Sequence, residues 1–219
     1  MRDADSTTYT GTFEDCRHHG TLLRAEALRR GYAKAQRSVC LGDGAAWIWE
    51  NARIHFPDAE QILDFYHASE HAGTLAGALF EAEQAKAQQT RWCHEMKQTS
   101  SAPIITQARA HLEERRPLLS AEQQQTIERE IACFQTNAER TRYGAFREAG
   151  CFIGSGVVEA GCKRVVGGRL KQSGMFWSHR GGDVLLTLRC MTMGSNFTQI
   201  WNARLPILTA PSSLAGPIP

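Results

Sequence analysis

The feature that most constrains the fold is a long central stretch, from about residue 68 to 149, in which glycine nearly disappears after Gly77. Ala, Gln, Glu and Arg dominate this stretch, and these residue types favour helices. The string SAEQ at 120–123 is typical of a capping box that opens a helix. We therefore predict an all-helical block of three or four helices in the middle of the chain.

The sequence before this block contains two short apolar segments. Residues 38–44 (SVCLGDG) and 61–67 (QILDFYH) predict strands. The segment 45–56 between them predicts a helix, with an apolar side that carries Trp47, Ile48 and Ile54. The order strand, helix, strand favours a parallel pairing of the two strands.

Three other segments have helical spacing. Residues 21–34 predict a helix ahead of the first strand. Glycines return at 150–156 (GCFIGSG), and residues 157–171 and 181–193 predict two more helices. This order predicts one α/β domain that carries a helical insertion.

Composition excludes several classes of protein. The chain of 219 residues has a net charge of +2, so its overall charge does not indicate a nucleic-acid binder. The N-terminus is polar, and no apolar run reaches the roughly 20 residues of a membrane-spanning helix. Its seven cysteines include no C-x-x-C pair, which favours reduced thiols. We expect a cytoplasmic protein that does not enter a membrane.

One motif suggests zinc chemistry. Residues 67–71 (HASEH) read H-x-x-E-H, the inverted zinc-peptidase signature. On a helix, His67 and His71 would share one face and bind one zinc ion, and Glu70 would activate a water molecule. Glu148 is a candidate third ligand. The alternative is an ordinary solvated helix face, because the motif fixes only three positions.

Asp43 is a second candidate. It ends an apolar strand between two glycines, and side chains at the carboxyl ends of parallel strands often meet ligands. An ordinary Asp-Gly turn explains the same residues. Local sequence leaves both interpretations open.

Two long strings favour the first interpretation. LGDGAAWIWENARIHFPDAEQILDFYHASEH and, much later, GSGVVEAGCKRVVGGRLKQSGMFWSHRGGDVLLTLRC closely resemble bacterial insertion-sequence transposases of the ISKra type, which belong with the mutator-like DDE group. The resemblance extends from DSTTYTG (5–11) to about Trp201. The combination of rare residues such as Trp47, Trp49 and Trp177 makes chance similarity implausible.

The resemblance implies a ribonuclease-H-like core with a helical insertion before the last catalytic residue. It implies two Mg²⁺ ions held by carboxylates for DNA strand cleavage and transfer. Asp43 and Glu159 match catalytic, metal-binding residues of the family, and Asp64 and His67 match a pair beside the active site. Hard oxygen ligands of this kind suit Mg²⁺.

The resemblance also implies DNA as the partner, both as transposon ends and as target, and leaves assembly into a homo-oligomer open. From Val157 to Arg180, Glu159 is the one acidic residue beside five basic ones, which suit a phosphodiester backbone: Lys163, Arg164, Arg169, Lys171 and Arg180. A solvated basic helix is the simpler alternative. We expect Phe176 and Trp177 to lie in the core rather than to stack on bases.

The family's first catalytic aspartate has no counterpart here, because Asp3, Asp5 and Asp15 lie in polar sequence. We therefore expect a C-terminal fragment with an incomplete sheet, inactive alone in strand transfer. The expected parts are the start of the core at 1–67, the insertion at 68–150, the end of the core at 151–204 and a disordered tail at 205–219. A non-catalytic DNA-binding or regulatory remnant of a transposase is the main alternative.

Overall fold

The computed structural model describes residues 7–194, 197–198 and 201–202. The chain forms two compact units. The central unit comprises Arg30–Gly156, and the terminal unit comprises Met1–Arg29 with Val157–Pro219. The predicted tail at 205–219 lies outside the described residues. The predicted domain boundaries mark where a helical insertion was expected to begin and end, whereas the two compact units are defined by the contacts within each unit. The predicted boundaries therefore stay a prediction.

The central unit begins with the predicted strand–helix–strand element. Strand β1 (Val39–Gly42), helix α2 (Ala46–His55) and strand β2 (Glu60–Leu63) follow one another, and the strands pair in parallel with Gly42 opposite Leu63. This part of the prediction is confirmed. The predicted apolar side of α2 is wrong at Trp47 and Ile54, which are about half exposed, whereas Ile48 packs against the core and Trp49 is the buried tryptophan.

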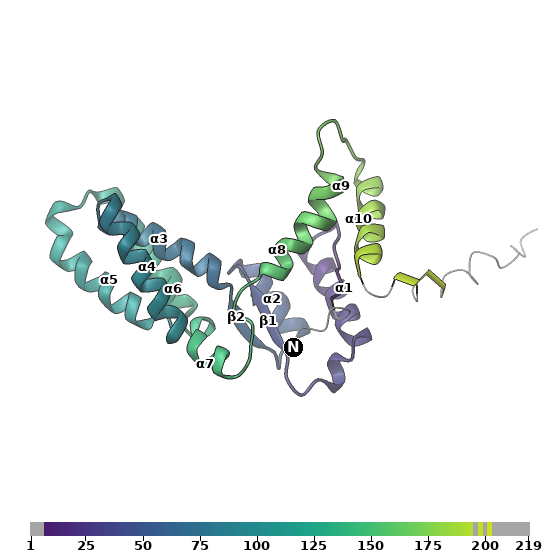
Figure 1. Cartoon of the computed structure of the whole chain (residues 1–219), viewed down its shortest axis with the longest axis horizontal. Helices are drawn as coiled ribbons and strands as arrows, with labels where there is room; N and C mark the ends of the chain where they lie inside the picture. The colour runs from purple at the N-terminus through teal and green to yellow at the C-terminus, as the bar shows by residue number, and fades with distance from the viewer. Residues whose placement is uncertain (1–6, 195–196, 199–200, 203–219) are drawn as a thin grey trace, which may run out of the picture. The chain divides into compact units, whose positions relative to one another are not determined.

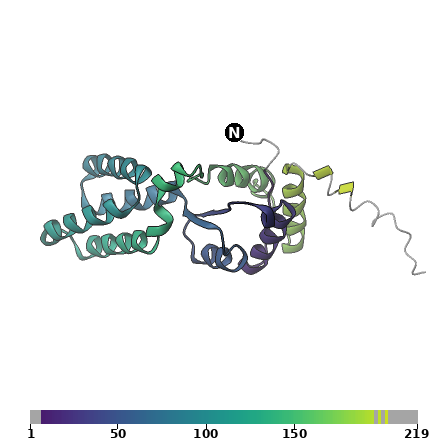
Figure 2. The same cartoon turned by 90° about the horizontal axis from the view of Figure 1, so that it is seen from below.

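A helical bundle follows β2, as the glycine-poor composition predicts. Figures 1 and 2 show its four long helices side by side. They are α3 (Phe65–Leu79), α4 (Ala82–Gln98), α5 (Ala102–Arg115) and α6 (Ala121–Thr136). The turns η3 (Arg116–Leu118) and η4 (Ala138–Thr141) and the short helix α7 (Tyr143–Glu148) complete the block. Ser120 and Gln123 form the predicted capping box of α6.

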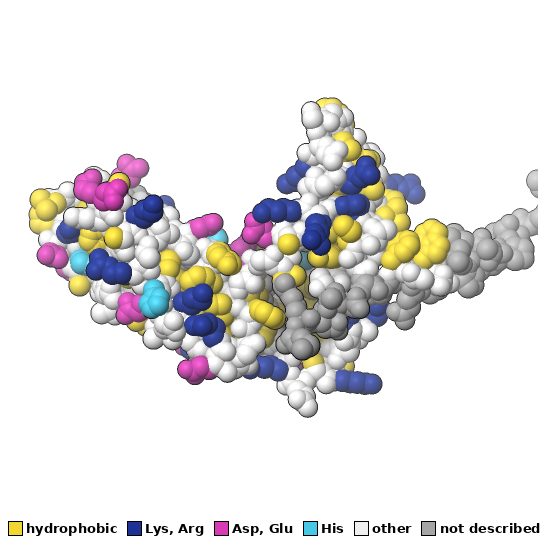
Figure 3. All heavy atoms as spheres, in the orientation of Figure 1, with side chains coloured by type: hydrophobic (Ala, Val, Ile, Leu, Met, Phe, Trp, Pro, Cys, Tyr) yellow, Lys and Arg dark blue, Asp and Glu magenta, His cyan; other side chains and the backbone are white. Residues whose placement is uncertain are grey.

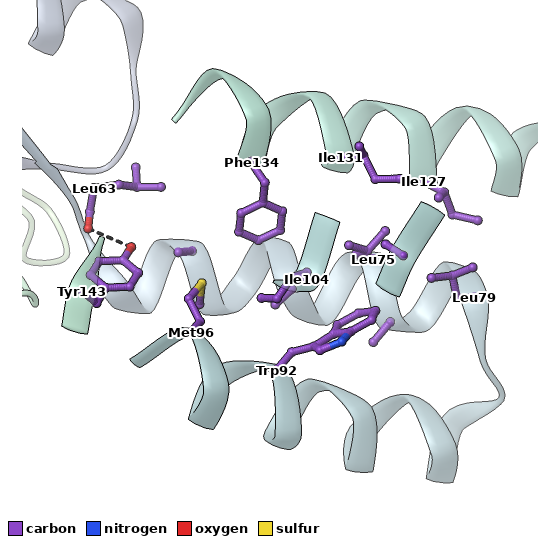
Figure 4. Packing of buried hydrophobic residues seen from close by; sticks show 14 of the residues in the cluster. Leu63, Leu75, Leu79, Trp92, Met96, Ile104, Ile127, Ile131, Phe134 and Tyr143 are labelled. Atoms are coloured by element: carbon purple, nitrogen blue, oxygen red, sulfur yellow. Dashed lines mark hydrogen bonds between the residues drawn. The ribbon is translucent and has the colours of Figure 1, made fainter. Parts of the chain in front are cut away.

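The bundle core is apolar and ends at a buried tyrosine whose hydroxyl group is hydrogen-bonded. Figure 4 shows side chains of four helices that converge between them, and all are buried: Leu75, Leu79, Trp92, Met96, Ile104, Ile127, Ile131 and Phe134. Tyr143 of α7 lies at one end, and its hydroxyl donates to the carbonyl of Leu63 at 3.0 Å. Burial raises the pKa of Tyr143. This hydrogen bond attaches the bundle to the end of β2.

The terminal unit is helical. It contains α1 (Cys16–Arg29) and a helical run made of α8 (Gly156–Cys162), the π-helical segment η5 (Lys163–Gly167) and α9 (Gly168–Leu170), followed by α10 (His179–Met193). Its small core consists of Val165, Leu170, Leu186 and Cys190. The predicted helices at 157–171 and 181–193 are confirmed. The predicted helix at 21–34 begins earlier, and it ends before Gly31, whose φ of 88° interrupts it ahead of η2 (Tyr32–Lys34).

The predicted α/β fold with a ribonuclease-H-like core is wrong. The described residues are mostly helical, and their sheet has two strands. The segments expected to extend the core contact other elements instead. Tyr9 packs against Gly161, and the carbonyl of Ile153 accepts a hydrogen bond from Phe65 N at 2.8 Å. The predicted strand 61–67 also ends early, because Asp64 starts a helix.

None of the helices among the described residues combines the length and the apolar character needed to cross a membrane.

Two glycines test the packing of the bundle. A Cβ at Gly144 would overlap the backbone oxygen of Gln98, whereas a Cβ at Gly77 would meet no atom within 4 Å. We expect Gly144→Ala to lower the free energy of unfolding by about 1–3 kcal/mol through overpacking. Gly77→Ala should raise it by up to about 1 kcal/mol through helix propensity. Urea denaturation of both variants measures the difference, and equal effects would contradict the packing described here.

Candidate functional site

The site is built at the carboxyl ends of the two strands. Because Gly42 lies opposite Leu63, the residues that follow them, Asp43 and Asp64, come from neighbouring strand ends. Asp64 N donates to the carbonyl of Gly42 at 2.7 Å. Asp43 is exposed, and its Oδ1 accepts a hydrogen bond from Ala45 N at 3.1 Å. Gly44, with φ of 92°, provides a turn that other residues adopt at a cost.

Asp64 has a structural task. Its side chain is buried, and Oδ1 accepts from Tyr66 N at 2.8 Å and from His67 N at 3.0 Å, which caps the N-terminus of α3. Oδ2 accepts from Ser155 N, after the chain has passed through the whole helical block. A carboxylate that accepts three backbone N–H groups has few lone pairs left for a metal ion. Asp64 therefore positions His67 rather than binding a ligand itself.

His67 and His71 meet one turn apart on α3. Their Nε2 atoms are 3.1 Å apart, and the rings pack edge to face. His71 Nδ1 lies 2.5 Å from Glu130 Oε2 on α6. One turn further along α6, Cys133 Sγ lies 3.8 Å from His71 Nε2. Two helices thus bring together a thiol, two imidazoles and a carboxylate.

The electrostatics assign the protons of this cluster. Glu130 is buried, with Arg129 as a second partner at 2.9 Å. The contacts of His71 with Cys133 and then with Glu130 raise the pKa of His71 to about 9, although burial opposes the shift. His71 is therefore an imidazolium near neutral pH, with Nδ1–H donating to Glu130. Its Nε2 has two neighbours, His67 Nε2 at 3.1 Å and Cys133 Sγ at 3.8 Å.

A pocket opens beside the cluster. Its volume is about 380 Å³, and its lining combines the strand ends with α3 and the end of α6: Asp43, Gly44, Ala45, Leu63, His67, His71, Cys133 and Asn137. Two predicted site residues, Asp43 and His67, therefore share one pocket.

The zinc-peptidase reading places its third ligand elsewhere. Glu148 is exposed on α7 and does not line this pocket. Glu70 is exposed, with Oε2 3.7 Å from His67 Nδ1. Among the residues that the structure describes, no three His, Cys, Asp or Glu side chains are placed to hold a metal ion. Zinc binding stays a prediction.

The other predicted site residues belong to the terminal unit. Glu159 is exposed on α8, and its Oε1 pairs with Lys163 Nζ at 2.7 Å. All five predicted DNA-binding side chains are exposed: Lys163, Arg164, Arg169, Lys171 and Arg180. Phe176 is 95% exposed and Trp177 is 44% exposed. The prediction that these two rings lie in the core is wrong.

Sequence reasoning missed Glu130, Cys133 and Asn137. Glu130 and Cys133 are three positions apart, so they lie on one face of a helix whose capping box was legible. The sequence of this helical face did not identify α3 as its partner helix, because many polar residues occur throughout the helical block. Pairing of α6 with α3 depends on tertiary packing.

Comparison with protein-family models, with curated proteins and with solved structures found no match in any of the three searches. The similarity to ISKra-type transposases therefore rests on the motifs quoted above and stays a prediction.

The raised pKa of His71 predicts a pH dependence of stability. The folded pKa of about 9 exceeds the ordinary value of 6.5, so His71 binds its proton more tightly in the folded chain. This contribution is complete below about pH 6.5 and is lost as the pH rises through about 9. We expect the free energy of unfolding to fall by roughly 1–2 kcal/mol over that range, because partial exposure screens the pair.

Urea denaturation at several pH values measures this fall. In His71→Gln the pH-dependent component should disappear, since glutamine does not titrate. A fall of the same size in the variant would assign the effect to other groups.

Proposed function

We propose that the chain is a DNA-binding protein of the DDE-transposase type, and that the basic part of its terminal unit contacts the phosphodiester backbone. The observation that carries the proposal is the exposure of five cationic side chains between residues 163 and 180. We call them the basic segment: Lys163, Arg164, Arg169, Lys171 and Arg180. Figure 3 displays dark-blue side chains gathered over α8, α9 and α10.

The charge of the chain is unevenly divided, which supports a specific contact surface. The central unit carries 16 acidic and 14 basic residues, whereas residues 157–180 carry five basic residues and Glu159 alone. Glu159 offsets part of this charge through Lys163. The remaining field is positive and local, as binding to a polyanion requires.

Two exposed aromatic rings extend this surface in sequence. Phe176 and Trp177 lie between α9 and α10, in the stretch of sequence between Lys171 and Arg180. Exposed aromatic rings next to cationic side chains are typical of surfaces on which unpaired bases stack. They favour contact with single-stranded or distorted DNA in addition to the duplex backbone.

Strand cleavage and transfer are the part of this proposal that rests on the resemblance alone. The family's chemistry would use Mg²⁺ held by Asp43 and Glu159. Asp43 is an exposed hard oxygen donor at a strand end, but Asp64 spends its oxygens on backbone N–H groups and Glu159 belongs to the other compact unit. DNA binding is therefore the activity that the geometry supports best.

Salt-dependent DNA binding tests the proposal. The full chain should bind a duplex with a single-stranded overhang, and its affinity should fall as salt rises, with a log–log slope of up to about −4.5 for five phosphate contacts. The variant K163E/R164E/R169E should abolish most of the binding and reduce the slope by about 3. Fluorescence anisotropy over a salt series measures both quantities.

The matched control reverses three exposed cations of the central unit, K86E/R91E/R109E. It changes the net charge equally, so an equal loss of affinity would indicate a general charge effect and contradict the assigned surface. Circular dichroism verifies that both variants remain folded.

A further inference from the structure

The cluster beside the pocket has an arrangement that DNA binding does not use. Cys133, His71 and Glu130 lie in a row, with Sγ 3.8 Å from Nε2 and Nδ1 2.5 Å from the carboxylate. This is the order of nucleophile, base and orienting group that activates side chains for covalent chemistry. We propose that Cys133 is a nucleophilic thiol that small, uncharged hydroperoxides oxidise to the sulfenic acid.

The partner of Cys133 is a group that can activate sulfur. The thiolate is the nucleophile in such reactions, and an imidazole beside the sulfur can take up the thiol proton. Cys133 Sγ lies 3.8 Å from His71 Nε2. Glu130 fixes the orientation of the His71 ring, because the buried carboxylate of Glu130 accepts a hydrogen bond from His71 Nδ1. His67 Nε2 is a second neighbour of His71 Nε2, at 3.1 Å.

Access to the sulfur is through the pocket. Cys133 is partly exposed and lines the cavity of about 380 Å³, which is ample for a peroxide. Asp43 contributes a carboxylate to the lining, and none of the described lining residues is Lys or Arg. Beside the one carboxylate and His71, the lining offers no further cation that would bind an anionic reagent such as a tripeptide disulfide, and small neutral oxidants are the reactants that fit.

The reaction balances with groups that are present. The Cys133 thiolate attacks one oxygen of the peroxide, the S–O bond forms and the O–O bond breaks. The departing hydroxide, or the alkoxide of an organic hydroperoxide attacked at its terminal oxygen, takes the Nε2 proton of His71 and leaves as water or an alcohol. Sulfur is oxidised to the sulfenic acid and the peroxide is reduced.

The chain contains an internal comparison. Cys151 belongs to the same unit and the same partly exposed class, but its Sγ faces the carboxylate of Glu60 at 3.8 Å instead of an imidazole. Arg37 pairs with the same carboxylate oxygen at 2.6 Å. Cys151 therefore faces a carboxylate–guanidinium pair, whereas Cys133 faces an imidazole.

The experiment treats the full chain with hydrogen peroxide near neutral pH, traps sulfenic acid with a 1,3-dione and quantifies each cysteine peptide by mass spectrometry. Iodoacetamide alkylation supplies a second readout that involves no oxidant. We expect Cys133 to react about tenfold faster than Cys151 with both reagents. Equal rates for the two cysteines would overturn the proposal.

Three variants assign the roles. His71→Ala should remove the rate advantage of Cys133, and Glu130→Gln should reduce it, while His94→Ala, an exposed histidine on α4, serves as the control and should leave it intact. An advantage that survives in His71→Ala overturns the role of the imidazole. If His71→Ala unfolds, the pH profile of alkylation in the wild-type chain decides: a rate already at its plateau near neutral pH supports the ion pair, and a rate that rises in parallel with that of Cys151 refutes it.

Discussion

The carboxylate of Asp64 is the interaction on which the central unit depends. It caps α3 through two backbone N–H groups and accepts a third from Ser155, so one buried side chain joins the strand end, the first helix of the bundle and the segment that leaves the bundle. Tyr143 adds a second attachment at the preceding residue by donating to the carbonyl of Leu63. The direction in which α3 leaves the sheet follows from these bonds. The placement of His67 and His71 in turn follows from the direction of α3.

The same geometry gives Asp64 and the two histidines that follow it different roles. Asp64 is fully engaged with the backbone, while His67 and His71, on the first two turns of α3, face a partner helix that supplies Glu130 and Cys133. The buried carboxylate of Glu130 stabilises positive charge on the cluster, which a purely apolar interior would disfavour. The polar cluster therefore depends on the pairing of α3 with α6.

Local patterns predicted those parts of the chain that local forces determine. The parallel pair β1 and β2, the helix between them, the capping box at Ser120 and the helices around 157–171 and 181–193 all follow from propensity and spacing. The ribonuclease-H-like core that the family resemblance implied was wrong, because the described residues form a sheet of two strands and are otherwise mostly helical. Trp47 and Trp49 illustrate the same limit, because periodicity gave α2 an apolar side but the packing buried the other tryptophan.

The candidate site was predictable only in part for a related reason. Asp43 and His67 belong to segments with recognisable motifs, and they do share a pocket. Glu130 and Cys133 come from about sixty positions further along the chain, where no motif marks them. Their role depends on which face of α6 meets α3, and that face is chosen by the packing of Ile127, Ile131 and Phe134 in the core.

The return of the chain to Asp64 has a consequence for the order of folding. Phe65 N bonds to the carbonyl of Ile153, and Ser155 N to Asp64, so both contacts close a loop of about ninety residues. Closing so long a loop in a flexible chain is entropically costly. Once the bundle has formed, packing of its helices has already brought the two ends of the loop together, so closing the loop costs little further entropy. We therefore expect the bundle to form before Ile153 and Ser155 make their contacts at the end of β2.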